Sequence, residues 1–114
     1  MIVAILGASS KPERYAFLAA QRLTVAGHRV IGINPAMPSV NGIEMVGTVL
    51  QLPPNVHTLT VYVAPNVSTN VADEIVGYGF RRVIFNPGSE NPPLAERLIA
   101  DGVEVVEACS LVLL

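Results

Sequence analysis

Short apolar runs alternate with stretches of helical periodicity along the whole chain. The first run, Ile2–Leu6, is apolar throughout and ends at Gly7, which is typical of a strand buried on both faces of a parallel sheet. Parallel neighbours need long crossover connections, usually helices, and these crossovers are right-handed. The alternation therefore predicts one α/β domain built on a parallel sheet.

The period of the apolar residues and the turn residues between them place the individual elements. Strands are expected at residues 2–6, 29–33, 58–63, 82–85 and 103–106. Helices are expected through Ala16, Ala19, Ala20 and Leu23, through Val71, Ala72, Ile75 and Val76, and through Leu94, Ala95, Leu98 and Ile99. Residues 36–54 contain several prolines and glycines and are predicted to form a long loop with a helical turn near residues 48–52. The sequence thus predicts a five-stranded parallel sheet with helices on both faces.

Composition narrows the classes of function. A length of 114 residues suits one domain, residues 1–114, without a separate catalytic domain. A net charge of −2 provides no basic field for nucleic acid, and the apolar runs are too short for a membrane span or a signal peptide. The single cysteine, Cys109, excludes an internal disulfide and fits a reducing cytoplasm. We therefore expect a cytoplasmic protein with neither a nucleic-acid nor a membrane partner.

The loops that follow the strands are the expected ligand site, because ligands of open α/β sheets bind at the carboxyl ends of the strands. The first of these loops begins with Gly7, Ala8, Ser9 and Ser10 and leads into a helix. Backbone N–H groups in such a turn and at a helix N-terminus favour an anion such as pyrophosphate, and Lys11 and Arg14 could neutralise it. The alternative interpretation is that Gly7 only forms a tight turn and that the serines only cap the helix.

The known nucleotide-binding motifs are not met in full. In the dinucleotide-binding pattern, glycines would occupy the positions of Ser9 and Pro12, and an acidic residue that binds the ribose would stand in place of Asn34. The sequence contains no Gly-Lys-Ser or Gly-Lys-Thr run of the kind that binds ATP phosphates. NAD binding and ATP hydrolysis are therefore disfavoured.

Catalytic side chains are also difficult to assemble. His28 and His57 come directly before predicted strands, which places them at the edge of the sheet opposite the ligand site. Cys109 follows the last strand on the ligand side, but it has no histidine nearby to act as its base. We interpret Cys109 as a buried structural thiol and expect no catalytic or metal-binding residues.

Several motifs occur in the order and at the spacing of a known family. They are Gly7-Ala8-Ser9 with Lys11-Pro12, Val30-Ile31-Gly32-Ile33-Asn34-Pro35, Val61-Tyr62-Val63-Ala64-Pro65, Asn86-Pro87-Gly88, and a cysteine two residues after Glu107. Over nearly the whole chain the sequence resembles the coenzyme A-binding domain proteins and is similar to the N-terminal domain of the succinyl-CoA synthetase α subunit. The resemblance implies a Rossmann-like three-layer fold and a site for coenzyme A or an acyl-CoA. The cofactor-binding residues that it implies are Gly7, Ala8, Ser9, Ser10, Lys11, Arg14, Asn34, Pro35, Val63, Ala64, Pro65, Asn86 and Gly88.

The sequence departs from the family pattern at several positions. Ala36 stands where a lysine usually follows the Asn-Pro pair, and Ala108 stands where an arginine usually precedes the cysteine. Ile84 and Asn86 replace a tryptophan and a glutamine. Because two cations are lost, binding of a phosphate-rich ligand is expected to be weaker unless Lys11 and Arg14 compensate.

The main hypothesis is a non-catalytic protein that binds coenzyme A or an acyl-CoA at the C-terminal edge of the sheet. One alternative is the NAD(P)-binding domain of an oxidoreductase. The other is an interaction or oligomerisation module with a vestigial crevice, in which an apolar tail would contact a second copy or an unknown protein partner. That tail consists of Leu111, Val112, Leu113 and Leu114. It could equally cover the core of its own domain.

Overall fold

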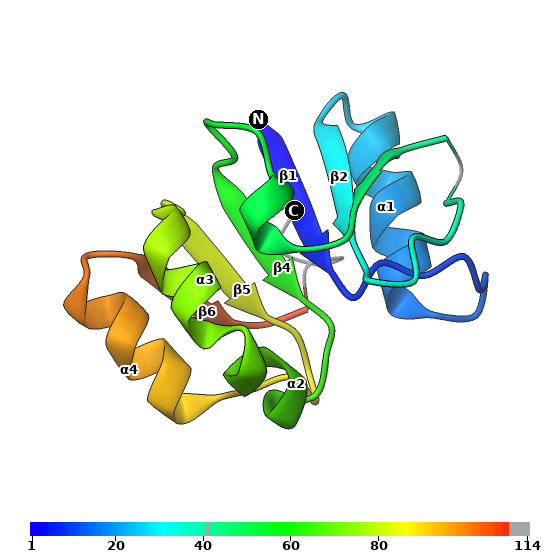
Figure 1. The fold of residues 1–114 in the computed structure, drawn as a ribbon. Helices are drawn as coiled ribbons and strands as arrows, with labels where there is room; N and C mark the ends of the chain where they lie inside the picture. Colours follow the sequence, from blue (N-terminus) through cyan, green and yellow to red (C-terminus); the bar gives the residue numbers. More distant parts are fainter. Residues whose placement is uncertain (41, 110–114) are drawn as a thin grey trace.

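The structure, a computed structural model, describes residues 1–40 and 42–109 (Figure 1). Within these residues one parallel sheet has the strand order β3-β2-β1-β4-β5-β6. The strands are β1 (Ile2–Leu6), β2 (Arg29–Ile33), β3 (Glu44–Val46), β4 (Thr58–Val61), β5 (Arg82–Phe85) and β6 (Glu104–Glu107). The helices are α1 (Tyr15–Val25), α2 (Pro65–Asn70), α3 (Ala72–Tyr78) and α4 (Pro92–Ala100), with a 3-10 turn η1 (Val49–Gln51). Each of these helices is too short or too polar to cross a membrane.

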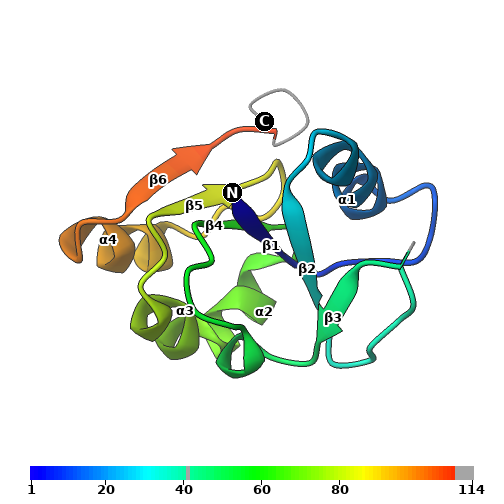
Figure 2. The same cartoon turned by 90° about the horizontal axis from the view of Figure 1, so that it is seen from above.

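Helices cover both faces of the sheet (Figure 2), as the sequence predicts. On one face, Val3 and Ile5 of β1 share a buried core with α1. On the other face, Ala4 and Leu6 share a larger core with η1, α3 and α4. This arrangement follows from the period of the strand, since successive side chains point to opposite faces and a strand covered on both sides must be apolar throughout. It leaves the carboxyl ends of the parallel strands together at one edge.

The edge strand β3 corrects the predicted number of strands. The described part of the chain forms a sheet of six strands, one more than predicted, because Glu44–Val46 pairs with β2 inside the segment predicted to be a loop. This strand is three residues long and no residue of it is fully buried, so no apolar run marks it in the sequence. The helical turn expected near residues 48–52 is present as η1.

The ends of several elements also differ from the predicted ones. The predicted second helix is divided in two at Val71, whose φ of −116° lies outside the helical range. Pro65 opens α2 at a position where proline is favoured, before the apolar periodicity begins. β4 ends at Val61 instead of residue 63, and β6 starts and ends one residue later than residues 103–106.

An ion pair ties the edge strand to its neighbour. The Arg29 guanidinium donates to both oxygens of Glu44 at 2.8 and 2.9 Å, and both side chains are about half exposed. Hydrogen bonding to Arg29 lowers the pKa of the Glu44 carboxyl. A carboxyl whose pKa is lower in the folded state stabilises the fold above its unfolded pKa, and this contribution is lost as the pH falls through the folded pKa.

We therefore expect Glu44→Gln to lower the Tm modestly at neutral pH, because an exposed ion pair contributes little. The difference in Tm between the variant and the natural protein should shrink as the pH falls through the acid range in which Glu44 is protonated. Thermal unfolding followed by circular dichroism at a series of pH values measures this difference. A difference that stays constant into the acid range would contradict the prediction.

Candidate functional site

A polar hollow of about 420 Å³ opens at the carboxyl ends of the central strands. Here the chain leaves β1 toward α1 on one face, whereas the neighbouring β4 continues into α2 on the other face. This divergence is the topological switch point, where ligands of open α/β sheets bind. The residues lining the hollow are Gly7, Ala8, Ser9, Lys11, Arg14, Tyr15, Ala16, Asn34, Tyr62 and Pro87.

Gly7 allows the chain to turn sharply out of β1. Its φ of +91° lies in the region that favours glycine, and its N–H donates to the carbonyl oxygen of Ile33 at 2.9 Å. A Cβ atom at this position would lie 2.8 Å from Val63 Cγ1, which is too close for real atoms. The turn therefore brings the backbone of the first loop against the chain that leaves β4.

Asn34 connects the loops that follow β1 and β2. Its Nδ2 donates to the carbonyl oxygen of Ala8 at 2.9 Å, and its Oδ1 accepts from the N–H of Ala36 at 2.9 Å. An aspartate at this position, as in the dinucleotide-binding pattern, could not donate to Ala8. Asn34 thus holds the first loop in place, a role that the sequence does not indicate.

The first loop presents its positive groups to the polar hollow. α1 begins at Tyr15, and the preceding Arg14 is extended and, within the described residues, provides no side-chain cap for the helix. The first N–H groups of a helix have no partner inside the helix, and Tyr15 and Ala16 carry them at the wall of the hollow. Ser9 Oγ accepts from the N–H of Lys11 at 3.1 Å, which folds the loop back on itself.

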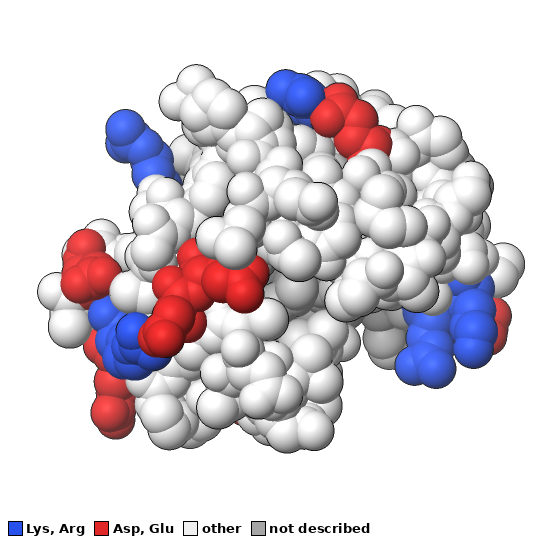
Figure 3. Space-filling view, viewed as in Figure 1, with Lys and Arg blue, Asp and Glu red and all other residues white. Residues whose placement is uncertain are grey.

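The cations of this loop are available to a ligand. Lys11 and Arg14 are exposed, and neither forms an ion pair with another described residue. Figure 3 shows basic side chains together at the corner of the molecule where the loop between β1 and α1 lies. Positive charge beside helix N–H groups favours an anion. The polar hollow can therefore accept a negatively charged group.

A second, apolar hollow of about 190 Å³ lies next to the first and shares Gly7 and Asn34 with it. Its wall comes from the ends of β1 and β2, from η1, and from α2 and α3. The lining residues are Leu6, Gly7, Ile33, Asn34, Pro35, Gly47, Thr48, Val49, Val63, Val67, Val71 and Glu74. The polar hollow and the apolar hollow thus adjoin each other at Gly7 and Asn34.

The structure brings together most, though not all, of the residues predicted to bind the cofactor. Gly7, Ala8, Ser9, Lys11, Arg14 and Asn34 line the polar hollow, and Pro35 and Val63 line the apolar one. Ser10, Ala64, Pro65, Asn86 and Gly88 line neither of these two hollows. The side chain of Asn86 is buried, and its Nδ2 donates to Thr60 Oγ1 at 2.7 Å and to the carbonyl oxygen of Val61 at 2.9 Å.

Sequence reasoning did not single out several residues of the two hollows. Tyr15, Tyr62 and Glu74 are the main ones. Tyr62 directly follows β4 and Tyr15 opens α1, so an exact prediction of where these two elements end and begin would have pointed to both. Glu74 lies in the first turn of α3, where an acidic residue is common and does not by itself indicate a ligand site.

The residues considered for catalysis lie elsewhere. His28 and His57 immediately precede β2 and β4, at the edge of the sheet opposite the hollows. Cys109 is half-buried and lines neither hollow, so it is more accessible than the buried thiol expected from the sequence. The described residues contain no cluster of His, Cys, Asp and Glu that could hold a metal ion. The apolar tail of Leu111 to Leu114 falls outside the described residues.

The strand order and the hollow at the switch point define a Rossmann-like α/β domain with a site at the carboxyl edge of its sheet. Within this class, the chain belongs to the family described as the CoA binding domain, whose model matches residues 2–114. No curated protein sequence matches the chain.

Several solved structures share the fold of this chain. The crystal structure of an uncharacterized protein has a TM-score of 0.92 and 37% identity, and the match covers 98% of this chain and 92% of that one. A Thermus thermophilus protein called cell-free ID.343 has a TM-score of 0.90 and 29% identity, with 97% and 85% covered. The dinucleotide-forming acetyl-coenzyme A synthetase 1 of Ca. Korarchaeum cryptofilum, solved with phosphate and ADP, shares the fold at a TM-score of 0.79. Its identity is 21%, and the match covers 94% of this chain and 25% of that one.

Proposed function

We propose that this protein binds coenzyme A or an acyl-CoA at the two adjoining hollows and does not transform it. The observation that carries the proposal is the polar hollow, in which Lys11, Arg14 and the N-terminus of α1 surround a glycine turn at the end of β1. Pyrophosphate is the part of coenzyme A that such a cradle recognises. Membership of the CoA binding domain family supports the same ligand.

The apolar hollow supports a ligand with an uncharged part beside its phosphates. It shares Gly7 and Asn34 with the polar hollow, so one ligand can occupy both across the sheet edge. Ala36 and Ala108 provide no charge at positions where the family usually carries cations. Lys11 and Arg14 then supply the positive side chains at this edge, and we expect moderate affinity.

The side chains at the polar hollow support a role in binding without catalysis. Among the described residues, its lining contains Ser9, Lys11, Arg14 and two tyrosines but no histidine, cysteine or carboxylate that could act as their base. A thioester reaction would need a nucleophile with an adjacent base, or a general acid and base near the reacting group. We therefore propose that the protein holds or presents the cofactor, in solution or to a partner protein.

Isothermal titration calorimetry with coenzyme A tests this proposal, with NADH, NADPH and ATP as comparison ligands at moderate salt. We expect saturable binding of coenzyme A that is tighter than that of the other three. Saturable binding of NADH or NADPH without coenzyme A binding would overturn the proposal in favour of a redox domain. If none of the four ligands binds, this protein has lost the ability to bind the ligand of its family.

A further inference from the structure

The apolar hollow contains one charged side chain, and that side chain lacks a partner. Glu74 comes from α3 and lines the hollow, and its Oε1 is buried without a hydrogen-bond donor among the described residues. The backbone N–H groups of Gly47 and Thr48, which border the same hollow, already donate to Gln51 Oε1. No lysine, arginine or histidine lines this hollow. Oε1 of this carboxylate is therefore a buried acceptor that no described donor satisfies.

An unpaired carboxylate oxygen in an apolar wall is costly unless a ligand supplies the donor. Buried polar atoms of this kind in a native structure call for an explanation, such as a role in binding. An alkyl chain in this hollow would leave the oxygen unpaired and would bury it further. A flat apolar ring that carries an N–H donor at its edge would fill the space and also satisfy Glu74.

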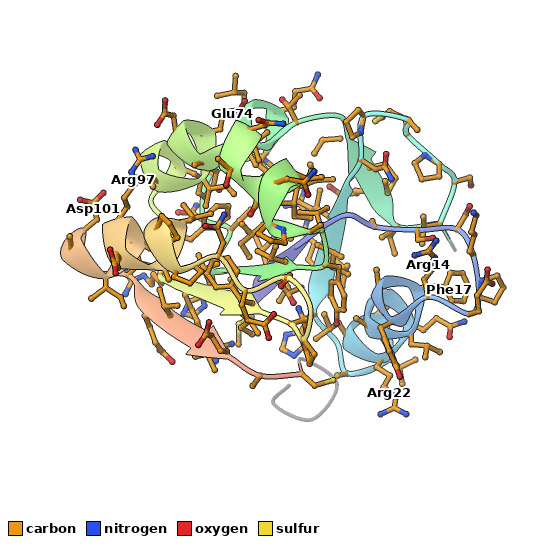
Figure 4. All side chains as sticks on the ribbon, turned by 90° about the horizontal axis from the view of Figure 1, so that it is seen from below. Arg14, Phe17, Arg22, Glu74, Arg97 and Asp101 are labelled. Atoms are coloured by element: carbon orange, nitrogen blue, oxygen red, sulfur yellow. The ribbon has the colours of Figure 1, made fainter. Side chains whose placement is uncertain are left out.

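The size of the apolar hollow also favours a single ring that is part of a larger ligand. Sites for whole ligands measure roughly 300–1,000 Å³, whereas this hollow measures about 190 Å³, so it suits one part of a larger molecule. The adjoining polar hollow suits phosphates. Figure 4 shows Glu74 on the side of the sheet opposite Arg14, so a ligand that contacts both must cross the carboxyl edge at Gly7.

We propose that the apolar hollow is a base-recognition subsite in which the Glu74 carboxylate accepts a hydrogen bond from the exocyclic amino group of adenine. Glu74 is then the residue that selects an amino-bearing base over one with a carbonyl oxygen at the same position. This inference rests on the proposed binding of coenzyme A, whose nucleotide base is adenine. It adds a specificity determinant on α3, far in sequence from the phosphate-binding loop.

Titration of the protein with ADP and with IDP, followed by NMR of the backbone amides, tests the subsite. The two nucleotides differ at one edge of the base, which carries an amino group beside an unprotonated N1 in ADP and a carbonyl oxygen beside an N1–H in IDP, so the exocyclic group opposite Glu74 changes from a donor to an acceptor. We expect ADP to bind at least about tenfold more tightly than IDP, the size of one charge-assisted hydrogen bond. Glu74→Gln should bring this ratio close to one, because a carboxamide can donate to the carbonyl oxygen as well as accept from an amine.

The matched control is Glu96→Gln, which makes the same change at an exposed position on α4 and should leave the ratio unchanged. If Glu74 had only a structural role, Glu74→Gln would weaken the binding of ADP and of IDP equally. Equal affinities for ADP and IDP in the natural protein would overturn the inference, as would a ratio that Glu74→Gln leaves unchanged. If either result occurs and calorimetry still shows coenzyme A binding, only the base subsite is overturned. If calorimetry shows no coenzyme A binding, the proposed function is overturned too.

Discussion

Replacing both basic side chains of the first loop, in the double variant Lys11→Gln and Arg14→Gln, is expected to weaken coenzyme A binding about a hundredfold. A charge-assisted hydrogen bond contributes about 1.5–3 kcal/mol, and the lower end corresponds to about a tenfold change in affinity for each side chain. The lower end applies because both side chains are exposed and are therefore screened by solvent and salt. Calorimetry with coenzyme A measures the change, and the affinity of the double variant should depend less on salt.

Arg22→Gln is the matched control for this experiment. Arg22 is an exposed arginine on the last part of α1, well separated from Arg14 (Figure 4), and it lines neither the polar nor the apolar hollow. Its replacement removes one charge without removing a ligand contact, so binding should change little. A comparable loss in Arg22→Gln would show that only the overall charge matters. Unchanged affinity in the double variant would show that the phosphates bind elsewhere.

Gly7→Ala is expected to destabilise the fold by about 2–6 kcal/mol and to abolish coenzyme A binding. A non-glycine residue with positive φ costs about 1–3 kcal/mol, and forcing an atom into a packed region adds about 1–3 kcal/mol. Both costs apply at Gly7, because its φ is +91° and a Cβ would lie 2.8 Å from Val63 Cγ1. Relief of this contact must move the Val63 side chain, the first loop or the chain after β4, and all three border the hollows.

Gly79→Ala separates the two costs. Gly79 has a φ of +90°, but among the described residues a Cβ there would meet no atom within 4 Å, and it lines neither hollow. We expect this variant to lose about 1 kcal/mol from backbone strain alone and to keep its affinity for coenzyme A. Urea unfolding gives both free energies. Equal losses in the two variants would mean that Val63 moves aside freely.

The main strands could be predicted from the sequence because they are short runs of apolar and β-branched residues. Ile2–Leu6 and Arg82–Phe85 have the bounds that the sequence predicts. β3 could not be predicted, because its three residues gain their conformation by pairing with β2, and such pairing leaves no local pattern. The division of the predicted second helix at Val71 was missed for a related reason, since valine is compatible with a helix and its φ is set by the surrounding structure.

The first loop of the site could be predicted because its glycine, serines and cations are adjacent in the sequence. The wall of the apolar hollow that α3 provides could not be predicted. Glu74 reaches this hollow from α3, and the orientation of α3 depends on its packing against η1 and the sheet. Asn86 shows that a sequence motif does not establish the direction in which a side chain points. The residue is present at the end of β5, but its amide donates into the protein, to Thr60 and to the carbonyl oxygen of Val61. Its contact with a ligand stays a prediction.

The central position of β1 in the sheet has a consequence for how the protein is made. β1 is synthesised before the other strands of the sheet, and on one side it pairs with β2, which follows after a single helix. On its other side Val3 pairs with Thr58, so that edge stays open until the ribosome has released the middle of the chain. An unpaired, apolar strand edge is prone to association with other chains. During synthesis this strand edge thus stays exposed for as long as β4 is missing.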